Sequence, residues 1–220
     1  RLETGKANRT RGGVFGQSTL SWRTRGPHLR FSPGVRLDVD TQFGSAITPR
    51  LAMSATFDED FVLRAGGGLG YRAPDFRELY LNFENPGVGY VVSGDPDLRP
   101  ERSVNANLGF EWSLSPDVKL NGYTFSNWIR NLINIGTVDL EPGAIQRFGY
   151  ENVSRAWTAG GELGLTLTPG PLDLGANLAL THAWDLDLDR QLANRVPVRL
   201  TGWLGLKPID RVLLRAQAGF

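Results

Sequence analysis

Apolar and polar residues alternate with period two along most of the chain, and this pattern predicts β-strands with one apolar and one polar face. The clearest segment is 105–114, where every second residue from Ala106 to Leu114 is apolar and the others are polar or glycine. Segment 61–71 alternates in the same way, with several glycines among its residues. The predicted strands, about ten in number, are residues 12–22, 29–39, 47–57, 61–71, 105–114, 118–133, 148–167, 172–184, 197–206 and 211–220.

The alternation assigns a face to each side chain in these strands. In the strand 29–39, for example, Leu29 and Phe31 share the apolar face, while Arg30 lies on the polar face. In the strand 118–133 the alternation becomes unclear after Gly122, so we expect a β-bulge there.

The connections between the strands fall into two alternating classes. Short turns rich in Pro, Gly and Asp are expected at 23–27, 58–60, 115–117, 169–171 and 207–210. Longer loops are expected at 40–46, 74–101, 134–147 and 186–196. Outer-membrane barrels have short periplasmic turns and long external loops, whereas a soluble β-sandwich or lipocalin-like barrel has no reason to keep this asymmetry. The pattern therefore predicts an all-β, antiparallel transmembrane β-barrel segment of about ten strands.

The order of turns and loops also predicts direction. With the long loops outside, the first strand would descend and the last would ascend, whereas a closed barrel of this class starts and ends in the periplasm. We therefore expect at least one further strand at each end, with residues 1–220 forming one segment of a larger barrel.

Composition restricts the choice less than the pattern does. The net charge of +1 and a pI near 8.3 do not favour nucleic acid as a partner. Mean hydropathy is −0.24, and no apolar run approaches the roughly 20 residues of a membrane helix. The absence of cysteine excludes disulfides and thiolate metal sites. The 27 glycines and six tryptophans suit a membrane barrel and a soluble all-β protein equally.

Two motifs flank the longest predicted loop. Tyr71-Arg72-Ala73-Pro74 ends one strand, and Asp95-Pro96-Asp97-Leu98-Arg99-Pro100-Glu101 opens the next. They resemble the FRAP-type and NPNL-type boxes of the TonB-dependent outer-membrane receptors. The residues that carry this resemblance are Tyr71, Arg72, Ala73, Pro74, Asp95, Pro96, Asp97, Leu98, Pro100 and Glu101.

The resemblance implies a 22-stranded barrel in the bacterial outer membrane, in contact with its lipid, with a plug domain in the lumen and a TonB box. It implies active uptake of a metal complex, a ferric siderophore or a cobalamin-like corrinoid, with energy from the TonB-ExbB-ExbD complex acting through the plug. A haem receptor of the same family and a passive porin-like channel are the alternatives. Haem receptors of this kind carry a histidine between the two boxes, but the only histidines here are His28 and His182.

The boxes also have a physical interpretation that does not need the family. Pro74, Pro96 and Pro100 mark where strands leave the sheet, since proline cannot donate to its hydrogen bonds. Arg72 and Glu101 are expected near the external rim, where an ion pair could join the two strands. The boxes could serve only to shape the loop, or they could contact the ligand.

The loop 75–94 carries the candidate ligand-binding residues. Its aromatic side chains could stack on a planar ligand or a catecholate, or they could pack the loop against its neighbours. The candidates are Arg72, Phe76, Tyr80, Phe83 and Tyr90.

Other chemistry receives less support. The run from Asp185 to Asp189 is similar to the start of a calcium loop, but Arg190 and Val196 stand where glycine and glutamate belong, so a solvated loop entrance is favoured. Gly66–Gly70 precedes no helix and is interpreted as space on the wall for a plug. No Ser, His and Asp arrangement suggests catalysis. We predict no enzyme activity, no resident cofactor and no bound metal.

Overall fold

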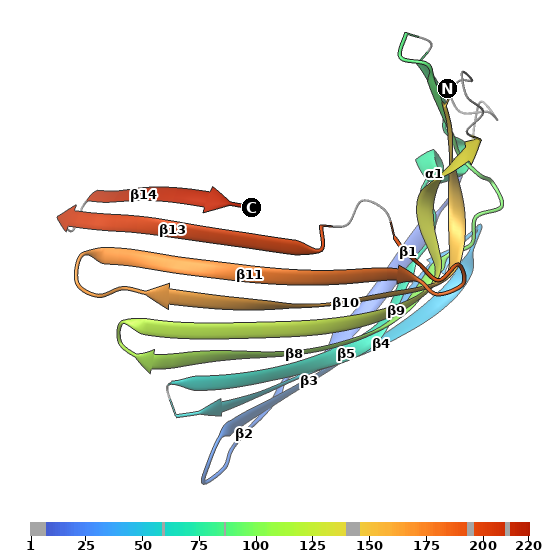
Figure 1. Cartoon of the computed structure of the whole chain (residues 1–220). Helices are drawn as coiled ribbons and strands as arrows, with labels where there is room; N and C mark the ends of the chain where they lie inside the picture. Colours follow the sequence, from blue (N-terminus) through green and yellow to red (C-terminus); the bar gives the residue numbers. More distant parts are fainter. Residues whose placement is uncertain (1–7, 59, 86, 140–145, 193–195, 210–211) are drawn as a thin grey trace.

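The computed structural model describes residues 8–220 except 59, 86, 140–145, 193–195 and 210–211, so parts of several predicted connections lie outside the described residues. The described chain is almost entirely β-strand (Figure 1). The strands are β1 (Arg11–Gln17), β2 (Leu20–Arg23), β3 (His28–Asp40), β4 (Gly44–Phe57), β5 (Phe61–Arg72), β6 (Asn82–Asn85), β7 (Tyr90–Ser93), β8 (Glu101–Ser115), β9 (Val118–Asp139), β10 (Gln146–Leu167), β11 (Leu172–Asp185), β12 (Arg190–Gln191), β13 (Val198–Ile209) and β14 (Val212–Gly219).

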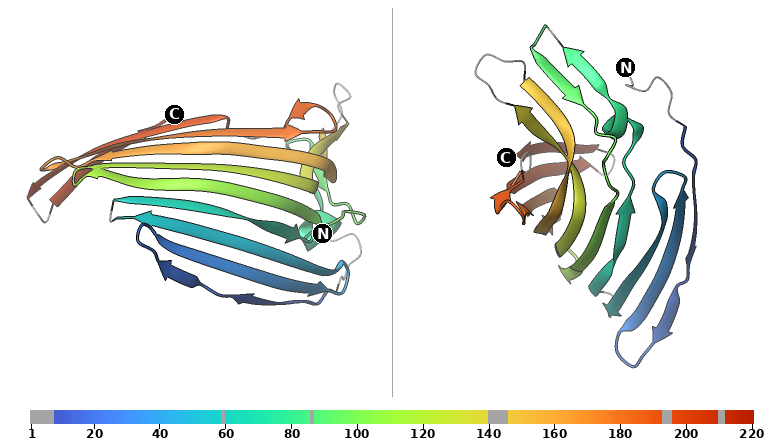
Figure 2. Two further views of the ribbon diagram at one scale, coloured as in Figure 1. Left: turned by 90° about the horizontal axis from the view of Figure 1, so that it is seen from below. Right: turned by 90° about the vertical axis from the view of Figure 1, so that its right-hand side faces the viewer.

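One curved sheet forms the whole wall. Its strands follow the order β1-β3-β4-β5-β8-β9-β10-β11-β13-β14, so ten strands lie side by side in chain order, each antiparallel to the next. The prediction of about ten antiparallel wall strands is therefore confirmed. The first predicted strand is interrupted at Ser18 and Thr19, and both of its parts, β1 and β2, pair with β3. Figure 2 shows the curvature of the sheet, which is open between β1 and β14.

No second sheet covers either face of this wall among the residues described. Leu108 keeps 47% of its surface exposed and Trp112 keeps 45%, values that a β-sandwich core would not allow. Cross-strand register confirms the predicted face: Phe61, Leu63 and Ala65 lie opposite Trp112, Phe110 and Leu108. We call this apolar face outward and the polar face inward, because a barrel wall meets lipid outside and water inside.

The predicted bulge after Gly122 is wrong. The pairing of β8 with β9 runs without interruption through Phe110 and Gly122, and the register shift lies at Ser113–Ser115, beside the turn. The alternation becomes unclear because the side-chain types are exchanged between the faces: Tyr123 is on the inward face, and Thr124 is on the outward one. The backbone stays regular, since the register depends on main-chain hydrogen bonds.

The asymmetry of the connections is present, but two loops are shorter than predicted. β3 and β4 pair up to Asp40 and Gly44, which leaves only a three-residue turn where residues 40–46 were expected to form a loop. β9 extends to Asp139 and β10 begins at Gln146, so most of the expected loop 134–147 that is described is strand. Beyond the bilayer neither face must be apolar, so the alternation ends before the strand pairing does. The end of the wall that carries the long connections is the extracellular end.

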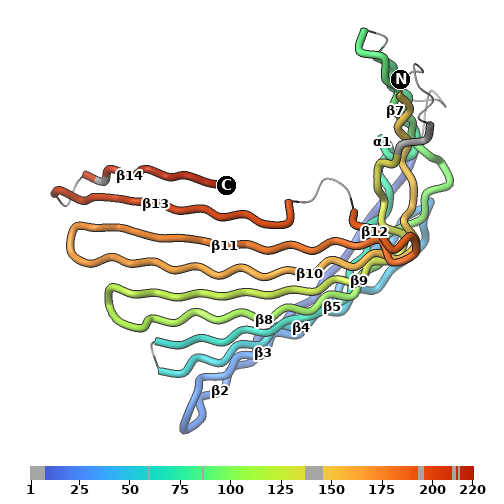
Figure 3. The backbone as a smooth tube through the Cα atoms, in the orientation of Figure 1, coloured from blue at the N-terminus to red at the C-terminus, as the bar shows by residue number. Residues whose placement is uncertain are grey.

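The long connection between β5 and β8 contains structure that the sequence pattern did not predict. It forms the short helix α1 (Phe76–Tyr80) and the hairpin β6–β7, and β7 pairs in parallel with β10. In Figure 3 these elements stand at the extracellular end, beyond the horizontal part of the wall. No helix in the described part of the chain is long and apolar enough to cross a membrane.

Candidate functional site

The two motifs meet at the extracellular end of β5 and β8, where Arg72 lies directly opposite Glu101. The Arg72 Nε and Nη2 atoms donate to the two Glu101 oxygens, each at 2.8 Å, and Nη1 donates to Glu78 Oε1 at 2.7 Å. Glu101 also accepts a hydrogen bond from the Ile133 backbone N–H at 2.8 Å. The expected ion pair is confirmed. Paired bonds of this charged kind are short and directional, so they fix where the long loop leaves the wall.

Helix α1 begins directly after the first motif because Asp75 caps it. Asp75 Oδ1 accepts from the Glu78 N–H, and Glu78 Oε2 accepts from the Asp75 N–H, each at 2.8 Å, which forms a capping box. Leu79 on this helix is completely buried. The second motif closes over it: Asp95 N donates to Glu78 O at 2.8 Å, and Leu98 is also buried. Both motifs thus form one compact base for the loop.

Gly94 makes this packing possible. A Cβ atom at this position would lie 2.6 Å from the Tyr80 backbone nitrogen and 2.7 Å from the Leu79 carbonyl carbon. Since backbone atoms cannot move aside as a flexible side chain can, only glycine fits where the returning chain crosses the end of the helix.

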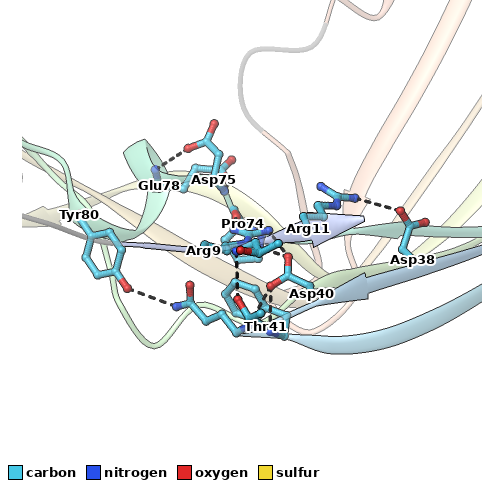
Figure 4. A network of polar contacts seen from close by, with 12 residues as sticks. Arg9, Arg11, Asp38, Asp40, Thr41, Pro74, Asp75, Glu78 and Tyr80 are labelled. Atoms are coloured by element: carbon cyan, nitrogen blue, oxygen red, sulfur yellow. Dashed lines mark hydrogen bonds and ion pairs between the residues drawn. The ribbon is translucent and has the colours of Figure 1, made fainter. Parts of the chain in front are cut away.

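A second polar network joins the loop base to the β3–β4 turn (Figure 4). The Arg9 guanidinium lies 2.6 Å from Asp40 Oδ2 and also donates to the Pro74 carbonyl. Asp40 Oδ1 accepts from the Gln42 N–H at 2.9 Å, and the Gln42 side chain donates to the Tyr80 hydroxyl at 3.2 Å. Tyr80 is therefore held by the wall beside it as well as by its own helix.

The candidate aromatic residues form two separate groups. Phe76 and Tyr80 lie one turn apart on α1, with their ring centroids 6.2 Å apart. Phe83 and Tyr90 pair across the β6–β7 hairpin at 5.9 Å, and Tyr90 contacts Phe148 of β10 at 6.4 Å. Phe76 and Phe83 are exposed, with 38% and 44% of their surfaces accessible. Arg72 is joined to α1 by its bond to Glu78, so it lies beside the first aromatic group. Phe83 and Tyr90 of the hairpin form the second group.

Sequence reasoning missed several residues of this end. The Asn152 side chain donates to the carbonyls of Arg99 and Asn131 and accepts from the Arg99 N–H, which ties the second motif to β9 and β10. Asn131 has a positive φ of 55°, a conformation that asparagine tolerates better than most residues. Arg9, Phe148 and Asn152 lie far along the chain from their partners, so no local pattern identifies them. An asparagine inside an expected strand was the only available signal.

The acidic run has structural partners throughout. Asp185 is buried and accepts from the N–H groups of Asp187 and Leu188, Asp187 binds Arg155, and Asp189 accepts from the Trp184 indole. The described residues contain no group of three or more His, Cys, Asp or Glu placed to hold a metal.

The two histidines both lie outside the connection between the two motifs. His28 opens β3 beside a short turn, and His182 lies near the end of β11. His182 stacks on Trp184 with ring centroids 5.2 Å apart.

The inward face of the wall is polar and carries several ion pairs. Arg64 contacts Glu111 at 2.5 Å, Arg36 contacts Asp38 at 2.7 Å, and Arg215 contacts Asp173. A hollow of about 530 Å³ lies against β3, β4, β5 and β8 and includes Arg30, which the alternation placed on the polar face. Gly66 also lines this hollow, and because glycine has no side chain its backbone is accessible from the lumen.

Comparisons with known proteins agree with this architecture. Residues 2–212 match the family model described as TonB dependent receptor-like, beta-barrel. The chain therefore belongs to the TonB-dependent receptors and forms part of their outer-membrane barrel.

Individual relatives give more detail. The chain is 28% identical over 163 residues to the iron-regulated outer membrane virulence protein of Vibrio cholerae, covering 70% of this chain and 25% of that protein. It is also 28% identical to the vitamin B12 transporter BtuB of Photobacterium profundum, covering 76% of this chain and 26% of the transporter. The chain spans about a quarter of the length of these relatives.

A solved structure shows the same wall. A mutant of the ferric enterobactin receptor PfeA from Pseudomonas aeruginosa, in complex with enterobactin, superposes with a TM-score of 0.75. The two sequences are 25% identical, and the match covers 96% of this chain and 32% of the receptor.

Proposed function

We propose that this chain is part of an outer-membrane receptor that binds a ferric siderophore outside the cell and takes it into the periplasm with energy supplied through TonB, ExbB and ExbD. The observation that carries the proposal is the loop base at Arg72, Glu101 and α1, which presents two aromatic groups at the extracellular end of a receptor barrel. The membership of the chain in the family supports uptake as the activity.

Charge and ring chemistry favour an anionic, aromatic iron complex as the ligand. Phe76 and Phe83 are exposed, and Tyr80 and Tyr90 are partly exposed beside them. Aromatic faces of this kind can stack on catecholate rings. Arg77 and Arg99 are exposed in the same connection and add positive charge to it. In this proposal Arg72 acts mainly by holding the loop base, because its charge is already balanced by Glu78 and Glu101.

A cobalamin-like corrinoid is the second candidate ligand. The similarity to a vitamin B12 transporter supports it, and a large ring system could also stack on the exposed aromatic residues. A haem receptor is less well supported, because no histidine lies between Pro74 and Asp95.

The proposed mechanism needs no covalent chemistry. A plug domain would occupy the lumen and contact the polar inward face, where Gly66 and its neighbours leave room for another chain. Pulling on that plug would open a path along the wet wall. A passive porin-like channel is the alternative, and it would require neither a plug nor TonB.

The test is uptake by cells that express the full-length protein. Cells without their own receptors would be given ferric enterobactin or haem as the sole iron source, or cobalamin as the sole corrinoid source, in the presence and absence of TonB. We expect growth on the ferric siderophore only when TonB is present. Uptake without TonB would support the passive channel, and uptake of cobalamin or haem alone would replace the proposed ligand.

Loop contact is tested with Tyr80→Ala and Tyr90→Ala, using Phe57→Ala at the opposite end of the wall as the control. We expect the two loop variants to bind ferric enterobactin about 2- to 10-fold more weakly, since one stacked aromatic pair contributes roughly 0.5–1.5 kcal/mol. Unchanged affinity in both loop variants would remove these residues from the ligand site.

A further inference from the structure

On the outward face, a row of arginines lies on the extracellular side of the apolar residues. Tyr71 lies opposite Arg102, Arg102 lies opposite Arg130, and Arg130 lies opposite Arg155, across β5, β8, β9 and β10. Because successive residues of a strand alternate between faces, these side chains share the face of Leu108 and Trp112. All three arginines are exposed.

The next outward row toward the membrane is apolar and aromatic. Val104 lies opposite Leu69 on one side and Trp128 on the other, and Trp128, Trp157 and Trp184 continue the row. Tryptophans in such a row mark the interface between hydrocarbon and head groups in membrane barrels. The arginines therefore lie at the level of the lipid head groups of the outer leaflet.

Two of these three positive charges have no carboxylate partner. Arg155 is bound by Asp187 through its Nε atom at 2.7 Å. Neither Arg102 nor Arg130 lies within ion-pair distance of a carboxylate in the part of the chain that the structure describes. Like charges directly opposite one another in a sheet destabilise it. This pair of arginines would therefore be stabilised by an external anion.

A hollow of about 510 Å³ lies beside the arginines on the same face. Its outward side chains include Ile47, Leu69, Val104 and Trp128, with Arg102 and Arg130 at the same site. The hollow thus combines an apolar lining, suited to a hydrocarbon chain, with two cations suited to a phosphate. Arginine also donates several hydrogen bonds to a phosphate in a fixed geometry.

We propose that this hollow binds a phosphate-bearing lipid of the outer leaflet, with the phosphate between Arg102 and Arg130 and an acyl chain along Leu69, Val104 and Trp128. The site faces the membrane, so it is separate from the route of the transported ligand and does not depend on which ligand that is. The bound lipid would neutralise the arginine pair and hold β5, β8 and β9 together below the loop base.

The experiment measures lipid binding to the purified full-length protein in a neutral detergent. The probes are a short-chain phosphatidic acid, a phosphatidylcholine with the same chains, and inorganic phosphate. Wild-type protein is expected to bind the phosphatidic acid best, and the affinity should fall as salt is raised. Equal binding of both lipids would contradict the role of the arginine charges. If inorganic phosphate bound as tightly as phosphatidic acid, the proposed binding of an acyl chain in the hollow would be wrong.

The variants separate this site from general surface charge. Arg102→Gln with Arg130→Gln should weaken phosphatidic acid binding about 30-fold, given the attraction of each basic side chain for an anionic lipid surface. Arg23→Gln with Arg25→Gln removes two exposed charges at the opposite end of the wall and should leave the affinity unchanged.

Folding and oligomerisation need their own controls. The Arg102→Lys, Arg130→Lys variant keeps both charges and should retain most of the binding, which distinguishes lost contact from lost folding. Unchanged affinity in the glutamine variant would overturn the proposal. A lipid-independent dimer that the glutamine variant abolishes would also overturn it, because the face would then bind a second copy.

Discussion

The wall and the loop base are stabilised in different ways. In the middle of the wall, Leu108 and Trp112 keep nearly half of their surfaces exposed, and the strands are joined by main-chain hydrogen bonds. At the loop base, Leu79 and Pro74 are fully buried, and Arg72 forms bonds to two carboxylates. The wall therefore needs only the right type of residue on each face, because lipid completes its packing. The loop base needs particular residues, because the protein alone completes it.

The largest effect is expected from Leu79→Ala at the loop base. Removing a fully buried leucine side chain should destabilise the local structure by about 3–4 kcal/mol, through lost burial and the cavity left behind. Hydrogen exchange in the segment 75–94 should accelerate while the wall strands stay protected. Phe76→Ala, at a residue that is 38% exposed, is the control and should change exchange much less. Equal acceleration in both variants would mean that burial does not hold this loop.

Leu108→Arg tests whether the outward face meets lipid. A charge on this face near the middle of the bilayer should lower the free energy of unfolding in lipid vesicles by about 3 kcal/mol. Asn121→Arg is the control, because it places the same charge on the inward face opposite Glu111. If the two variants lost the same stability in denaturant titrations, the assignment of faces would be wrong.

Gly175→Ala tests packing on the inward face. A Cβ at Gly175 would lie 2.0 Å from the Trp203 ring, which donates to Asp173 from its indole nitrogen at 3.0 Å. The ring must move, so we expect the free energy of unfolding to fall by about 2 kcal/mol. Gly16→Ala is the control, since nothing lies within 4 Å of its Cβ position. Denaturant titration of both variants measures this difference. Equal midpoints for Gly175→Ala and Gly16→Ala would contradict the prediction.

The smallest difference is expected between two arginine–glutamate pairs. Glu101→Gln should lower the free energy of unfolding by about 1–2 kcal/mol, because the Glu101 side chain is only 16% exposed and binds both Arg72 and the Ile133 N–H. Glu111→Gln should cost less than about 1 kcal/mol, since that side chain is 61% exposed in its pair with Arg64. Denaturant titration at low and high salt measures both. A stronger salt effect at Glu101 than at Glu111 would contradict this ranking, because exposed pairs are screened more.

The residue pattern predicted the wall well, for a physical reason. Lipid on one face and water on the other impose alternation wherever a strand crosses the bilayer, so the faces of Leu29, Met53, Leu108 and Leu178 could be assigned directly. Where the bilayer ends, that constraint ends too. The lengths of β9 and β10, the helix α1 and the parallel pairing of β7 with β10 were therefore not predicted.

The motifs were informative for the loop base only in part. They placed Arg72 and Glu101 near each other, because two strands joined by one loop must meet at its base. They did not identify Arg9, Gln42 or Asn152, whose partners lie more than 20 residues away in the chain. Such contacts depend on the register between neighbouring strands, and no local sequence pattern predicts that register.

The sequence by itself determined the ten wall strands, the face of each and the end that carries the loops, because each of these follows from the solvent that a single strand meets. Only the tertiary structure decided which side chains from different strands stand together. The base of the long loop and the row from Tyr71 to Arg155 both arise from cross-strand register, which is set by main-chain pairing between segments far apart in the chain.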